Sequence, residues 1–138
     1  MTVIKEYNTS TGLWEPIVSG VQGPAGPTGP AGAAGDWSSA QTVNPVTTGP
    51  YTVLNSDAGK VVCWSGSGAT TFTIDTATSL AVGQKIDFIN LTTGVLTFAG
   101  SGVTLSGTPG LKTRAQYSAA TLICVISGIY VLIGDLTV

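Results

Sequence analysis

Carboxylates are the main side chains in this sequence that could do acid–base or metal chemistry, and they lie far apart. Asp36, Asp57, Asp75, Asp87 and Asp135 fall in different predicted turns or strands, and the chain contains no histidine. Without histidine the common nucleophile–base pairs are absent, and the acids lack the spacing of a calcium loop. We therefore predict no enzyme, no catalytic residue, no cofactor and no metal site. A glycan hydrolase with paired carboxylates is the least supported alternative.

The two cysteines lie in apolar runs. Cys63 falls within Val-Val-Cys-Trp and Cys124 within Leu-Ile-Cys-Val-Ile. Such surroundings predict two buried, reduced thiols that act as small hydrophobic side chains. A disulfide between facing strands is the alternative.

Trp64 is the one aromatic side chain that we single out as a receptor contact. It ends a predicted strand beside the loop 65–70, and aromatic rings bind sugar faces and anchor interfaces. Packing in the core is the alternative role for this residue.

The most specific pattern is a run of glycines at every third position, with proline after three of them. The glycines are Gly20, Gly23, Gly26, Gly29, Gly32 and Gly35, and the prolines are Pro24, Pro27 and Pro30. Three polyproline-II chains can wind together only where every third residue lacks a side chain. The pattern predicts a collagen-like triple-helical stalk over residues 20–35. A flexible Gly/Pro/Ala linker is the alternative.

A stalk of this length, roughly 50 Å, has too few triplets to hold three chains together unaided. A neighbouring domain must then form the trimer. Residues 1–19 predict a small hairpin, which needs a partner surface to be stable and is therefore interpreted as a virion-attachment segment. Residues 36–138 predict the trimeric head.

The head is predicted to be an all-β sandwich, jelly-roll-like, because short extended runs recur every 8 to 12 residues. These runs are 51–54, 60–64, 70–74, 84–91, 95–98, 103–105, 121–126 and 130–136. Several alternate between apolar and polar positions, so that Phe72 and Ile74, for example, share one face. The last two runs are apolar on both faces, which in a trimer predicts a place at the threefold axis.

Composition also favours a self-associating protein. Only 9% of the residues are charged while 43% are hydrophobic, so part of the surface is expected to be covered by further copies. No basic cluster indicates nucleic-acid binding. The longest apolar stretch, 122–133, is broken by Ser127 and Gly128 and is too short to insert in a membrane. The N-terminus lacks the pattern of a secretory signal.

The order of these segments resembles that of collagen-like minor tail proteins and tail fibres of tailed bacteriophages. The resemblance starts with Tyr-Asn-x-x-Thr-Gly-x-Trp-x-Pro at residues 7–16, continues through the triplets, and extends to loose motifs at 54–62, 82–86 and 133–136. It implies a homotrimer on a virion, attached through residues 1–19 to another virion protein and adhering to a bacterial surface glycan or protein. A capsid (head) fibre or decoration protein is the alternative, and a spore-surface collagen-like protein is a third interpretation.

Overall fold

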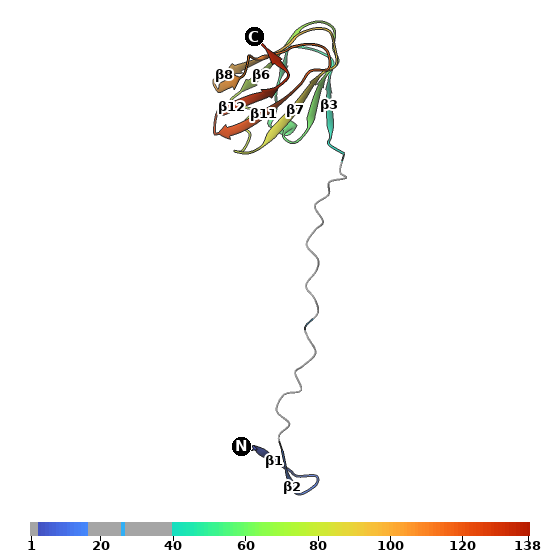
Figure 1. Ribbon diagram of the computed structural model, residues 1–138, viewed down its shortest axis with the longest axis vertical. Helices are drawn as coiled ribbons and strands as arrows, with labels where there is room; N and C mark the ends of the chain where they lie inside the picture. The colour runs from blue at the N-terminus through green and yellow to red at the C-terminus, as the bar shows by residue number, and fades with distance from the viewer. Residues whose placement is uncertain (1–2, 17–25, 27–39) are drawn as a thin grey trace. The chain divides into compact units, whose positions relative to one another are not determined.

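The computed structural model describes residues 3–16, 26 and 40–138. The chain divides into two units, Met1–Trp37 and Ser38–Val138. Among the described residues every regular element is a strand, apart from one 3-10 turn, η1 (Asn55–Asp57), so the predicted all-β class is confirmed (Figure 1). The predicted stalk, residues 20–35, lies outside the described residues except for Gly26.

The first unit contains the hairpin that the sequence predicts. Strand β1 (Lys5–Asn8) pairs antiparallel with β2 (Leu13–Pro16). Asn8 shapes the turn, because its side-chain oxygen accepts hydrogen bonds from two backbone N–H groups. Tyr7 packs against Trp14 with ring centroids 5.3 Å apart. Trp14 is nevertheless 64% exposed, so this hairpin has no core of its own.

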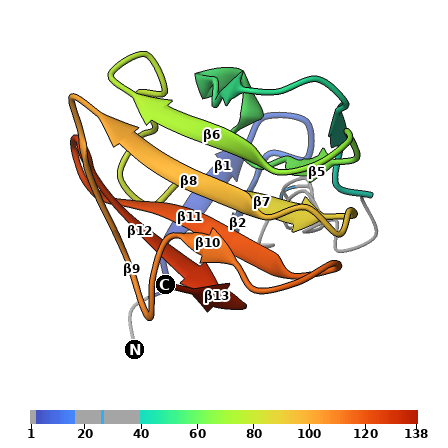
Figure 2. The same ribbon diagram turned by 90° about the horizontal axis from the view of Figure 1, so that it is seen from above.

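The second unit is a sandwich of two mixed sheets (Figure 2). The six-stranded sheet has the order β3 (Val43–Val46), β5 (Val61–Trp64), β7 (Lys85–Asn90), β11 (Ala119–Ile126), β12 (Ile129–Gly134) and β9 (Thr104–Gly107). The five-stranded sheet has the order β13 (Leu136–Thr137), β10 (Lys112–Thr113), β8 (Leu96–Ser101), β6 (Thr70–Asp75) and β4 (Tyr51–Thr52). The inner faces of both sheets contribute to one hydrophobic core.

The chain alternates between the two sheets from β3 to β8. Strands β3, β5 and β7 are parallel neighbours in one sheet, and β4, β6 and β8 are parallel neighbours in the other. The expected jelly-roll topology is therefore wrong, because a jelly roll is built from antiparallel Greek keys. We call one such passage, for example from β3 through β4 to β5, a circuit. Each circuit crosses between the sheets twice, and the chain returns to the first sheet running in its original direction.

The core is centred on an aromatic cluster. The ring of Phe72 lies 5.1 Å from Tyr51, 6.2 Å from Trp64, 6.0 Å from Phe88 and 6.2 Å from Phe98, measured between centroids. Most of these pairs meet edge to face, the arrangement that aromatic quadrupoles favour. The predicted inward positions are confirmed, since each is at most 2% exposed: Phe72, Ile74, Ile86, Phe88, Leu96 and Phe98.

One carboxylate is buried in the sandwich. Asp57, at the end of η1, is 1% exposed and accepts hydrogen bonds from Asn44 Nδ2 (2.9 Å), the Tyr51 hydroxyl (2.7 Å) and the Leu54 N–H (3.0 Å). Burial, together with the hydrogen bond to Asp57 and the charge of that carboxylate, raises the pKa of Tyr51 to about 12. Asp57 thus fixes η1 and the β3 and β4 strands at the same time, in addition to its predicted place in a turn.

Both cysteines are free and buried, as predicted for reduced thiols. Cys124, like Leu122 two residues before it, lies on the inner face of β11. Cys63 lies between the inward-facing Val62 and Trp64, so its thiol is on the outer face of β5. Burial raises the pKa of the Cys63 thiol, which keeps it protonated and unreactive at neutral pH.

Candidate functional site

The described residues contain neither a metal-binding cluster nor a membrane-spanning helix. Over residues 3–16, 26 and 40–138, no three His, Cys, Asp or Glu side chains are placed to share a metal ion. Within the same ranges, no helix is long and apolar enough to cross a membrane. Two surfaces of the head remain as candidate sites, a group of loops at one end and the outer face of the six-stranded sheet.

Three loops follow the carboxyl ends of the parallel strands β3, β5 and β7, and so lie at the same end of the head. We call residues 47–50, 65–69 and 91–95 the uncharged loop group, because none of them is charged. The chain reaches β3 at its opposite end, through residues 40–42. The uncharged loop group is therefore displayed at the end of the strands away from the point where the chain joins the head.

Trp64 lies beneath this loop group and is only 2% exposed. Its indole N–H donates to the Gly68 carbonyl at 3.2 Å, and a Cβ added at Gly66 would collide with the ring. These contacts are those of a side chain packed in the core, which was the alternative role for Trp64. Its contact with a receptor stays a prediction. The indole borders a shallow hollow of about 300 Å³, whose other lining residues are Gly49, Pro50, Ser67, Ala69, Thr70 and Thr71.

Asn90 holds the loop 91–95 in place from below. It is fully buried, and its amide nitrogen donates to the Gly94 carbonyl at 2.8 Å and to Thr113 Oγ1 at 3.1 Å. Its side-chain oxygen accepts from the N–H of Thr92 at 3.1 Å. Buried amides with every group satisfied rigidify their surroundings. The loops 65–69, fixed by the bond from Trp64 to Gly68, and 91–95, fixed by Asn90, therefore present hydroxyl and backbone groups on a rigid frame, suited to hydrogen bonding with a neutral polar ligand.

The outer face of the six-stranded sheet is mainly apolar. We call its apolar residues the aliphatic face: Val43, Pro45, Val61, Cys63, Ile89, Ala119, Ile123, Ile129, Val131 and Ile133. They are cross-strand neighbours, with Ile123 opposite Val131 and Cys63 opposite Ile89. The sequence signal for this face was the pair of runs, 121–126 and 130–136, that are apolar on both sides.

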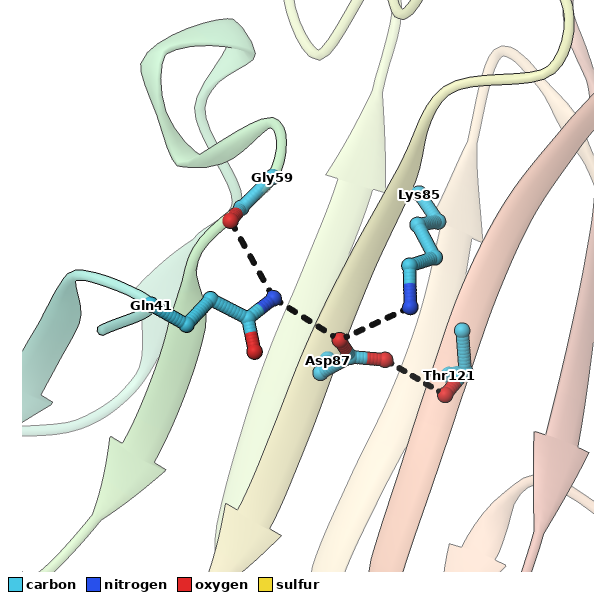
Figure 3. Close-up of polar contacts among 5 residues, drawn as sticks. All are labelled: Gln41, Gly59, Lys85, Asp87 and Thr121. Atoms are coloured by element: carbon cyan, nitrogen blue, oxygen red, sulfur yellow. Dashed lines mark hydrogen bonds and ion pairs between the residues drawn. The ribbon is translucent and has the colours of Figure 1, made fainter. Parts of the chain in front are cut away.

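A polar cluster interrupts the aliphatic face (Figure 3). Asp87 accepts hydrogen bonds from Thr121 Oγ1 at 2.6 Å and from Gln41 Nε2 at 3.0 Å, and it pairs with Lys85 Nζ at 3.3 Å. Gln41 also donates to the Gly59 carbonyl at 3.1 Å. The sequence did not reveal this cluster, because its members are up to 80 positions apart (41 to 121) and meet only through the strand pairing.

The Asp87 cluster gives an expected pH dependence. Burial alone would raise the pKa of Asp87, but the hydrogen bonds from Thr121, Gln41 and Lys85, and the charge of Lys85, outweigh it and lower the pKa below 3.8. A depressed carboxyl pKa stabilises the fold above the ordinary pKa, and this contribution is lost as the pH falls through the folded value. We expect wild type to be more stable than Asp87→Asn at pH 7, with the difference vanishing in acid.

Urea unfolding at one fixed protein concentration, at several pH values from 7 down to 2, measures this difference. The matched control is Asp75→Asn, since Asp75 is a turn carboxylate outside the cluster. A difference for Asp87→Asn that stays constant across the pH range would show that the charge of Asp87 has no stabilising role.

No protein-family model and no curated protein matches this chain. Function is therefore inferred from features of the chain itself: the glycine triplets, the uncharged loop group and the aliphatic face.

Proposed function

We propose that this chain is a non-enzymatic, homotrimeric fibre protein of a bacteriophage virion, in which the β head serves adhesion to the host surface. The observation that carries the proposal is the unbroken glycine register from Gly20 to Gly35, directly before an all-β head. A triple helix is the one common structure that requires this register. In this proposal residues 1–19 attach the fibre to another virion protein and residues 20–35 form the spacer.

The layout of the head supports adhesion. The chain joins the head at the start of β3, and the uncharged loop group lies at the far end of β3, β5 and β7. Exposed hydroxyl groups such as those of Ser67 and Thr93 can hydrogen-bond to a surface glycan or protein. A single small loop site binds weakly, but three copies on a common stalk gain effective concentration and bind with avidity.

Location on the particle tests this function first. Gold-labelled antibody against the head, viewed on intact virions by electron microscopy, is expected at the tail tip or baseplate. Label distributed over the capsid would overturn the adhesion proposal in favour of a capsid fibre or decoration protein.

A binding experiment tests the loops themselves. Purified full chain is expected to bind susceptible cells and to slow phage adsorption, and the double variant Ser67→Glu/Thr93→Glu is expected to lose most of both effects. Thr73→Glu, on the outer face of β6 beyond the residues that line the hollow, is the matched control and should bind like wild type. Equal binding by all three proteins would exclude the loops as the adhesive surface.

The stalk gives a separate prediction. Replacing Gly26 with valine puts a side chain at the crowded axis of a triple helix, so we expect the collagen-type circular dichroism signal to be lost and the segment to become protease-sensitive. The mass by light scattering should remain about three times that of the 13.9 kDa chain, because the head forms the trimer. The control is Ala25→Val, at a triplet position that tolerates side chains. Equal protease resistance in both variants would favour the linker interpretation.

A further inference from the structure

We propose that the aliphatic face is the surface through which the heads of three copies associate. This inference rests on the trimer in the proposed function and adds the location of its interface. The partner that binds the aliphatic face is a second copy of the same chain. The aliphatic face or the adjoining edge of that copy covers the exposed side chains.

The two outer faces of the sandwich differ sharply in composition. The outer face of the five-stranded sheet carries threonines at Thr52, Thr71, Thr73, Thr97 and Thr137, here called the threonine face. Threonine suits a strand face that remains in water. On the other side, the aliphatic face contains Ile133 at 50% exposure and Val43 at 55% exposure. Contiguous apolar surface of this kind indicates an interaction site.

The carboxylate on this face, Asp87, is already paired within one chain. Both oxygens of Asp87 are used, Oδ1 by Thr121 and Oδ2 by Gln41 and Lys85. Burying a charge in an interface is costly when it has no partner. Because Asp87 has its partners from its own subunit, another copy can cover it without leaving the carboxylate unsatisfied.

The position of the stalk in the sequence identifies the occupant as another copy. Residues 36–42 separate the last triplet glycine from β3, and seven extended residues span at most about 25 Å. Three chains wound together would therefore bring three β3 strands within that distance of the end of the stalk. Strand β3 is the edge of the six-stranded sheet and carries Val43 and Pro45 of the aliphatic face, so each copy has part of this face tethered near the end of the stalk.

The decisive test is the oligomeric state of the full chain carrying Val131→Glu. Val131 lies on β12, the last strand that contributes to the aliphatic face, opposite Ile123 on one side and Ser106 of the edge strand β9 on the other. A glutamate there would place a charge in the apolar interface of every copy, and taking that charge out of water is costly, so we expect trimer association to weaken on the order of 100-fold or more. Light scattering at micromolar concentration should then give a monomer. Thr97→Glu, on β8 in the middle of the threonine face, should remain a trimer.

The outcomes separate the inference from the proposed function. If wild type is itself a monomer, the trimeric fibre fails and the interface with it. If wild type and Val131→Glu are both trimers, the trimer stands and only this location is overturned, leaving the face open to another virion protein. Circular dichroism establishes that Val131→Glu is folded.

A second measurement covers the case in which Val131→Glu does not fold. Ile133→Cys and Thr97→Cys each place an accessible thiol on one outer face, whereas the native thiols are buried. Maleimide should label Ile133→Cys at least about tenfold more slowly than Thr97→Cys in the trimer, because the neighbouring copies shield it. Equal labelling rates in a trimeric sample would overturn the interface.

Discussion

Replacing Phe72 with alanine is expected to lower the free energy of unfolding of the head by about 3–5 kcal/mol. Phe72 is fully buried and contacts four aromatic rings drawn from both sheets. Removal of its ring takes away buried apolar area and leaves a cavity that strands paired on both sides cannot close. Urea unfolding followed by tryptophan fluorescence measures the loss, since the ring of Trp64 is one of those contacts.

Phe72→Leu is the matched control. Leucine keeps most of the volume, so the expected loss is about 1.5 kcal/mol. Comparing the free energies of unfolding of the two variants separates the cost of leaving a cavity from the cost of any substitution at this position of β6. A loss for Phe72→Ala no larger than that for Phe72→Leu would contradict the central place of this ring.

Asp57→Ala is expected to cost about 3 kcal/mol, because buried donors are left without an acceptor. The side chain of Asp57 accepts from Asn44, Tyr51 and Leu54, and water does not reach a site that is 1% exposed. The variant should also lower the pKa of Tyr51, since the hydrogen bond and the charge that help to raise it are removed. Thermal and urea unfolding give the stability, and a spectroscopic titration of tyrosine gives the pKa.

Asp75→Ala is the control for this carboxylate. The Asp75 side chain accepts one hydrogen bond, from the N–H of Ala77 at 2.8 Å, in a turn that water reaches. Its replacement should cost about 1 kcal/mol. If Asp57→Ala and Asp75→Ala cost the same, Asp57 would be an ordinary turn residue without a role in joining β3, β4 and η1.

The sequence predicted the strands of the head well where alternation was strong. The runs 70–74, 84–91 and 95–98 correspond to β6, β7 and β8, because apolar residues at every second position identify an inward face. Strands β3 and β10 were missed. The first contains Pro45, a residue that is rare inside paired strands, and the second has only two residues, Lys112–Thr113, too few to show a period.

Topology and surface clusters could not be predicted in the same way. Alternation gives the face of a strand but not its direction, so the parallel order of β3, β5 and β7 was mistaken for a jelly roll. The Asp87 cluster needs Gln41 and Thr121 as well, and their approach depends on register between distant strands. Trp64 was singled out by its residue type and its place at a strand end beside a loop, and neither distinguishes an indole on a surface from one beneath the loop.

The alternating path from β3 to β8 also sets how such a head can change in size. One circuit of the chain adds one strand to each sheet, and both new strands join parallel neighbours. An insertion or duplication of a whole circuit would lengthen the sandwich, keep the remaining strand pairs and add one more loop to the uncharged end. Loss of half a circuit would instead move every following strand to the opposite sheet. The complete circuit is therefore the unit that can be added without breaking the remaining strand pairs.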